Sequence, residues 1–132
     1  MEESELLGIV GLAVMVVRSS DTSLAQGGND LPLVATSAIQ NLIESACSSA
    51  LIDHLAFGET TVTSKVLIEM ETSVSVGDEL QGSARVVDIE DGSITFEAEV
   101  TRREKIIATA RVQRRLVDRL SYLARIAAER LI

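Results

Sequence analysis

Apolar residues change their spacing along the chain, and each spacing predicts a different element. The apolar run Leu6–Val17 places valine, isoleucine and methionine on both alternating faces, which is typical of a strand covered on both sides. A polar stretch, Ser19–Pro32, follows as a loop, either a lid or a plain connector. Helical spacing then predicts a helix from Ala38 to about Leu55, started by a capping box in which Ser37 is followed three residues later by Gln40.

Alternation with a period of two dominates the second half of the chain. It predicts four strands, over Thr61–Thr72, Asp78–Glu90, Ser93–Arg102 and Lys105–Leu116. Asp91-Gly92 is a strong signal for a tight hairpin turn between the second and third of them. In the first of them, the apolar side is expected to carry Val62, Val66, Ile68 and Met70. Leucines and alanines over Asp118–Ile132 return to helical spacing and predict a terminal amphipathic helix.

The order of elements indicates an α+β fold in which one long helix packs on an antiparallel sheet. A chain of 132 residues is expected to form one domain, residues 1–132. The composition, 46% hydrophobic and 24% charged, is that of a folded protein.

Charge and cysteine content narrow the possible partners. A formal net charge of −8, without a basic run longer than Arg114-Arg115, argues against nucleic-acid binding. The apolar N-terminal run is too short to cross a bilayer, and its flank is acidic where a signal peptide is basic. With one cysteine, Cys47, no internal disulfide can form. We therefore expect a cytoplasmic protein without a membrane or nucleic-acid partner.

One face of the predicted central helix has an unusual composition. Glu44 is the only charged residue between Leu31 and Ile52, and it shares its face with Gln40, Asn41 and Ser48. Short neutral polar side chains are weak helix formers, and a face exposed only to water more often carries Lys, Arg and Glu. The composition therefore favours partial burial of the Glu44 face, by a second subunit or by a ligand.

The run Pro32-Leu33-Val34-Ala35-Thr36, with Glu44 eight residues after the threonine, resembles the hotdog-fold thioesterases similar to fluoroacetyl-CoA thioesterase. Three further stretches resemble the same family: "TTVTSKVLIEMETSVSVGDEL", "GSITFEAEV" and "IIATARVQRRLVDRLSYLARI". The resemblance covers roughly Leu6–Ile126. It implies a hotdog fold, a five-stranded antiparallel sheet wrapped around a central helix, and a homodimer with active sites at the subunit interface. Further association to a tetramer stays open.

In this family a threonine before the helix, a glutamate within it and a histidine on the next strand carry the chemistry. By position they correspond to Thr36, Glu44 and Met70. The third position therefore departs from the family pattern, and so does Thr63, because Val62-Thr63 stands where the family tends to have Val-Gly near the thioester.

The resemblance implies that Glu44 is a general base or a nucleophile, while Thr36 and the helix N-terminus stabilise the oxyanion. Thr36 can equally be a capping or turn residue, and Glu44 a polar interface contact. Met70 and Thr63 are expected to line the substrate site, and Met70 can also be a core residue. Arginines that could meet the phosphates of coenzyme A are Arg85, Arg111, Arg114 and Arg115, with ordinary pairing to Glu97 and Glu99 as the alternative.

The single cysteine and the single histidine are not expected to take part in catalysis. Cys47 lies on the apolar stripe of the helix as a structural thiol, and His54 has no neighbouring acid or nucleophile in the sequence that would make a triad. No metal ligand pattern and no cofactor motif is present.

The first hypothesis is an acyl-CoA hydrolase that acts as a homodimer. The alternatives are a non-catalytic hotdog module that holds an acyl thioester or a small apolar ligand, and a purely structural dimer.

Overall fold

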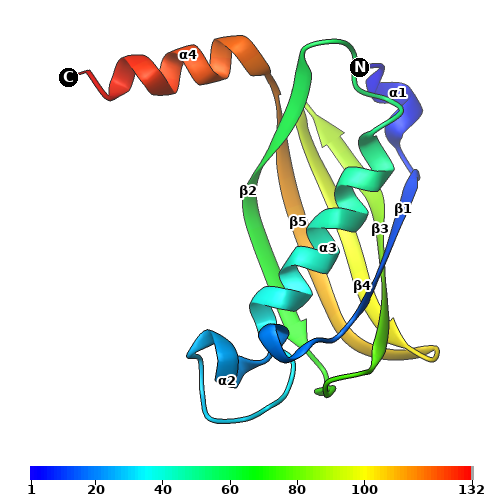
Figure 1. Cartoon of the computed structure of the whole chain (residues 1–132). Coiled ribbons are helices and arrows are strands. Elements are labelled where there is room, and N and C mark those ends of the chain that lie inside the picture. Colours follow the sequence, from blue (N-terminus) through cyan, green and yellow to red (C-terminus); the bar gives the residue numbers. More distant parts are fainter. Residues whose placement is uncertain (132) are drawn as a thin grey trace.

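The predicted sheet and central helix are both present in the computed structural model, which describes residues 1–131 (Figure 1). All strand pairs are antiparallel, and the sheet has the order β1-β3-β4-β5-β2. The strands are β1 (Val10–Val16), β2 (Glu59–Met70), β3 (Glu79–Glu90), β4 (Ser93–Arg102) and β5 (Lys105–Asp118). The helices are α1 (Glu3–Leu6), η1 (Ser19–Asp21), α2 (Ser23–Gln26), α3 (Thr36–Leu51) and α4 (Arg119–Glu129).

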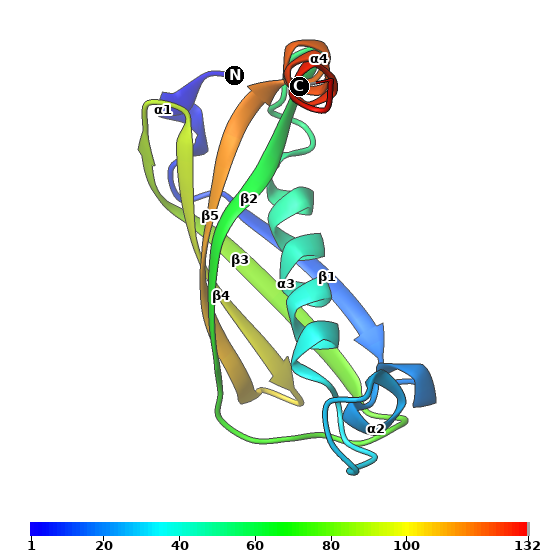
Figure 2. The same cartoon turned by 90° about the vertical axis from the view of Figure 1, so that its left-hand side faces the viewer.

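The sheet curves around α3 and buries its apolar stripe (Figure 2). α3 packs mainly against β1 and β3. A transverse row of small residues on the inner face of the sheet, Gly11, Ala84, Ala98 and Ala110, leaves room for this approach. A Cβ atom at Gly11 would overlap the backbone oxygen of Ala46, so only glycine permits the observed packing of β1 on α3.

The predicted hairpin is confirmed. Asp91 and Gly92 both have positive φ, 48° and 79°, as a two-residue turn between twisted strands requires. The inward residues of β4 that the alternation predicts are buried, while Glu97 and Glu99 point outward and are exposed. The next turn, at Arg103-Glu104, also uses positive φ at both residues and returns the chain into β5.

Strand β2 differs from its predicted pattern because it contains a β-bulge. Its register against β5 shifts between Thr63 and Lys65, so Ser64 is the extra residue. Thr63 pairs with Arg114 and Val66 with Val112, which places Thr63 and Val66 on the face that looks toward α3. The expected grouping of Val62 with Val66 is therefore wrong, since a one-residue insertion exchanges the two faces of a strand.

Strand β1 is shorter than predicted and is not covered on both sides. It starts at Val10, after the short helix α1. Its inner face packs on α3, whereas Val10, Leu12, Val14 and Val16 are half exposed or more on the outer face. The prediction of a strand buried on both faces is therefore wrong for the single chain. The alternation of branched residues on both faces could not reveal that β1 is an edge strand.

The N-terminus of α3 also differs from the prediction. The helix starts at Thr36, with Ala35 as its N-cap and without a side-chain cap. Ser37 is inside the first turn, and its hydroxyl donates to the side chain of Gln26 instead of closing a capping box with Gln40. At the other end the helix stops at Leu51, four residues before the predicted end. The preceding polar segment is less irregular than expected, because η1 and α2 form within it.

Helix α4 starts where the sequence predicts. Asp118 is its N-cap and accepts the backbone N–H of Ser121, which holds the pKa of this carboxyl below its ordinary value. The helix projects from the end of β5 away from the sheet (Figure 1), and its apolar residues, such as Leu120 at 78% exposure, are uncovered. Ile132, the predicted last residue of this helix, lies outside the described residues. Within residues 1–131, no helix is both long and apolar enough to cross a membrane.

Candidate active site

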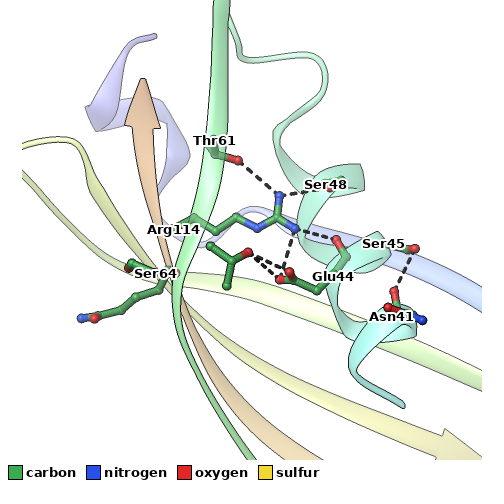
Figure 3. Close-up of polar contacts among 9 residues, drawn as sticks. Asn41, Glu44, Ser45, Ser48, Thr61, Ser64 and Arg114 are labelled. Carbon is green, nitrogen blue, oxygen red and sulfur yellow. Dashed lines mark hydrogen bonds and ion pairs between the residues drawn. The ribbon is translucent and has the colours of Figure 1, made fainter. Parts of the chain in front are cut away.

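Glu44 lies in the middle of α3 on the side that faces β2, and two side chains from the strands contact its carboxylate (Figure 3). The hydroxyl of Thr63 on β2 lies 2.9 Å from Oε1 and 2.7 Å from Oε2 and donates to this carboxylate. Arg114 on β5 donates from Nη2 to Oε1 at 3.3 Å, which makes an ion pair. The three residues therefore form a hydrogen-bonded cluster across three elements, and we call it the Glu44 cluster.

The guanidinium of Arg114 is fixed by several acceptors. Nη2 also donates to the backbone oxygen of Glu44 at 3.0 Å, and Nη1 donates to the hydroxyls of Ser48 and Thr61 at 3.0 and 3.2 Å (Figure 3). Arg114 is only 7% exposed. Its Nε is buried and has no hydrogen-bond partner within the described chain. A buried arginine is stable only when it is paired, so Glu44 and the two hydroxyls compensate for its burial.

The bulge in β2 explains why these side chains meet. Thr61 and Thr63 lie two residues apart, before the extra residue, and so point to the same face of the strand. Arg114 is opposite Thr63 in the register of β2 with β5, which brings the two side chains together. The hydroxyl of Ser64, the bulged residue, donates instead to the backbone oxygen of Gln113. In a strand with regular alternation, Thr63 and the apolar residues between the bulge and Met70 would point to opposite faces of the sheet. The bulge places them on the same face, toward α3 and the core.

On the face for which partial burial was expected, only Glu44 is partly buried within the single chain, whereas Gln40, Asn41 and Ser48 are exposed. The Glu44 side chain is 27% exposed and Ser48 is exposed. Arg114 and Thr63 cover the Glu44 carboxylate, and the cover of the whole face by a second subunit or a ligand stays a prediction. The carboxylate stays partly accessible to solvent and is held in one orientation. Such a group can accept a proton from a hydroxyl or a water that reaches it.

The two remaining predicted residues do not join the Glu44 cluster within one subunit. Thr36 is the first residue of α3 and is exposed. It precedes Glu44 by eight residues, which corresponds to about 12 Å along the helix axis. Met70 is the last residue of β2, pairs with Ala108 and packs half-buried against the core. The start of α3 and the end of β2 lie at the same end of the molecule (Figures 1 and 2).

The arginines considered for coenzyme A phosphates occupy different places. Arg85 and Arg111 flank Glu97 on the outer face of the sheet, with distances of 3.9 and 3.2 Å to its carboxylate. They line a hollow of ≈ 590 Å³ on that face, on the opposite side of the sheet from Glu44. Arg114 is buried at the Glu44 cluster, so its guanidinium faces a carboxylate of the chain. Arg115 is exposed.

Cys47 is fully buried in the core, and burial raises the pKa of its thiol to about 12. It is therefore a protonated structural thiol at neutral pH, as the sequence predicts. Among residues 1–131, no group of three or more His, Cys, Asp and Glu side chains is arranged to hold a metal ion. Thr61 was not predicted for this site. Its spacing of two residues from Thr63 is the signal that could have indicated it.

The structure resembles solved hotdog proteins along its whole length. A hot-dog-like protein from Thermanaerovibrio acidaminovorans has a TM-score of 0.89 at 18% sequence identity, covering 98% of this chain and 97% of its own. A hypothetical protein of the thioesterase superfamily from Thermus thermophilus has a TM-score of 0.84 at 21% identity, covering 95% and 94%. The fluoroacetyl-CoA thioesterase FlK has a TM-score of 0.84 at 16% identity, covering 92% and 95%. At these identities the matches establish the fold, which is an α+β hotdog-like fold.

The family model that matches the sequence defines the class of protein, which is the hotdog thioesterase superfamily. A sequence model of the family described as FlK, fluoroacetyl-CoA-specific thioesterase, matches residues 17–120. This range includes α3 and strands β2 to β5, and the chain belongs to this family. No curated protein sequence matches the chain significantly.

Proposed function

We propose that the protein hydrolyses an acyl thioester, most simply an acyl-CoA, with Glu44 as the residue that activates the attacking oxygen or attacks itself. The observation that carries the proposal is the half-buried carboxylate of Glu44, which Arg114 and Thr63 hold in one orientation in a chain of a thioesterase family. Two mutants of FlK have been solved with ligands, one in complex with acetyl-CoA and one with fluoroacetate and coenzyme A, which supports a substrate of this class.

Thioester hydrolysis also needs a group that stabilises the negative charge on the carbonyl oxygen. The N-terminus of α3 offers free backbone N–H groups and a partial positive charge, and Thr36 adds a hydroxyl there. This point lies about 12 Å from Glu44 on the same helix, so both cannot contact one carbonyl group. In the proposed enzyme, Glu44 of one subunit therefore acts on a thioester bound at the α3 N-terminus of its partner.

This geometry makes the homodimer part of the proposal. β2 is an edge strand of the sheet and carries Thr63 toward the Glu44 cluster, so a second subunit joined along β2 would enclose the site. Helix α4 begins at the end of β5, the strand next to β2, and its apolar residues are uncovered. A subunit joined along β2 would therefore lie close to these apolar residues as well. A dimer is expected in sedimentation velocity at micromolar concentration. A chain that stays monomeric while it turns over thioesters would contradict the shared site.

A second candidate function is a non-catalytic module that binds an acyl thioester or a small apolar ligand. Met70 favours it, because it occupies the position to which the family resemblance assigns the histidine, and a thioether neither donates nor accepts a proton. In the structure this side chain packs against the core, as a residue that fills apolar space does.

One experiment separates the two functions. The purified protein is assayed for thiol release against a panel of acyl-CoA esters of different chain length, together with Glu44→Gln. The control is Glu69→Gln, which removes an exposed carboxylate from β2. We expect Glu44→Gln to lower kcat by about 100-fold or more and Glu69→Gln to leave it unchanged. Thermal stabilisation by an acyl-CoA without turnover of any ester would instead support the binding module.

A further inference from the structure

The hydroxyl of Thr63 has the geometry of an activated nucleophile. It donates to both oxygens of the Glu44 carboxylate, at 2.9 and 2.7 Å, which is within the range required for proton transfer to a general base. The carboxylate is in turn oriented by Arg114. A hydroxyl, a base in contact with it and a third group that orients the base are the parts of a nucleophile triad. Thr63 is exposed within one subunit, so its hydroxyl is accessible to a thioester that binds between the two subunits of the proposed dimer.

The other hydroxyls of the site lack this arrangement. Ser48 and Thr61 accept N–H groups of Arg114, and neither donates to a carboxylate within the described residues. The hydroxyl of Ser45 donates to the backbone oxygen of Asn41. Among the described residues of this site, Thr63 is therefore the one whose hydroxyl donates to a side chain that can act as a base. A glycine at this position, as the resemblance describes, would offer no such hydroxyl.

Resting on the proposed function, we propose that Thr63 is a catalytic residue whose Oγ1 attacks the thioester. In the first step Glu44 takes the hydroxyl proton while Oγ1 forms a bond with the carbonyl carbon. The carbon–sulfur bond then breaks, and the thiolate takes the proton from Glu44 and leaves as the free thiol. The product of this half-reaction is an acyl ester on Thr63.

In the second step water hydrolyses the ester. Glu44 accepts a proton from the water as its oxygen attacks the acyl carbon. The bond from that carbon to Oγ1 breaks, Glu44 returns the proton to Oγ1, and the carboxylic acid leaves. Both enzyme groups are then in their starting state, and one water has been consumed. Glu44 serves as base and acid in both halves, so this route needs no histidine at position 70.

The test uses the full-length protein and an acyl-CoA ester that it turns over. Thr63→Val removes the hydroxyl at nearly constant shape, and Thr63→Ser keeps a hydroxyl. Ser64→Ala is the matched control, because this neighbouring hydroxyl donates to the backbone of β5 and lies on the far side of β2 from Glu44 (Figure 3). We expect a loss in kcat of about 100-fold or more for Thr63→Val, a much smaller loss for Thr63→Ser, which keeps the nucleophilic hydroxyl, and a near wild-type rate for Ser64→Ala. Thermal unfolding of each variant verifies that it is folded.

A second measurement locates the covalent intermediate. Acid quenching during the first turnover, followed by peptide mapping, is expected to find the acyl group on Thr63. A single turnover with excess enzyme in oxygen-labelled water is expected to label the released acid and not the protein. Label in Glu44, or a Thr63→Val variant within about threefold of the wild-type kcat, would overturn the proposal. Absence of turnover by the wild type on every ester is a different result, which refutes the hydrolase function itself.

Discussion

Replacing Arg114 by methionine tests whether the Glu44 cluster holds α3 to strands β5 and β2, at the edge of the sheet opposite β1. Methionine keeps much of the arginine stem and removes four hydrogen bonds, two of them to Glu44 and one each to Ser48 and Thr61. Breaking a buried ion pair costs about 3–5 kcal/mol, mainly because a charge is left without its partner. The Glu44 side chain is 27% exposed, so water can solvate the remaining carboxylate. We therefore expect a loss near the lower end, about 3 kcal/mol.

This loss is measured by urea unfolding followed by far-UV circular dichroism. In thermal unfolding it corresponds to a decrease in Tm of about 10 °C for a domain of this size. The control is Arg85→Met, because Arg85 is exposed on the outer face and lies 3.9 Å from its partner Glu97. Its effect is expected within about 0.5 kcal/mol of zero.

A double-mutant cycle with Glu44→Gln completes this test. Glutamine leaves the buried Arg114 cation without its counter-charge, so the single variant should also be less stable than the wild type. If the two side chains interact as the structure indicates, the double variant will be more stable than the sum of the single effects by about 1 kcal/mol or more. A cost below about 1 kcal/mol for Arg114→Met, together with additivity within about 0.5 kcal/mol, would refute the reasoning.

Three further predictions concern the core, the thiol and the last helix. Gly11→Ala is expected to destabilise the protein by about 2–3 kcal/mol in urea unfolding, because its Cβ would overlap the backbone of Ala46. Gly28→Ala, whose Cβ has space, is the control and should be near neutral. A Gly11→Ala variant as stable as the wild type would contradict the packing of β1 on α3. Cys47, with its pKa raised to about 12, should resist alkylation at neutral pH in the native protein and react in denaturant, as mass spectrometry can show. Because the pKa of Asp118 is lowered from its ordinary 3.8, its contribution to stability is present above that value and is lost as the pH falls through the lower folded pKa. In an acid titration followed by circular dichroism, Asp118→Asn should lose less stability over this range than the wild type, and identical titrations would contradict the role of this cap.

Much of the fold can be derived from local pattern. The Asp91-Gly92 turn, the alternation in β4 and the start of α4 after Asp118 all depend on neighbours in sequence, and the structure confirms them. Glu44 could also be singled out, because one carboxylate among short neutral side chains departs from what a solvated helix face normally carries. In these cases the residues that decide the outcome lie within a few positions of one another.

The rest depends on contacts between residues far apart in the chain. Local pattern could not place β1 at an edge of the sheet, and it could not locate the bulge at Ser64 that reverses the faces of β2. Pairing with β5 sets that register and puts Thr63 opposite Arg114, 51 positions along the chain, with both against Glu44. The sequence by itself determined which elements form and supplied the carboxylate, the hydroxyl and the guanidinium. Only the tertiary structure decided that these groups meet, because a hydrogen bond between distant residues depends on strand register, which no local spacing encodes.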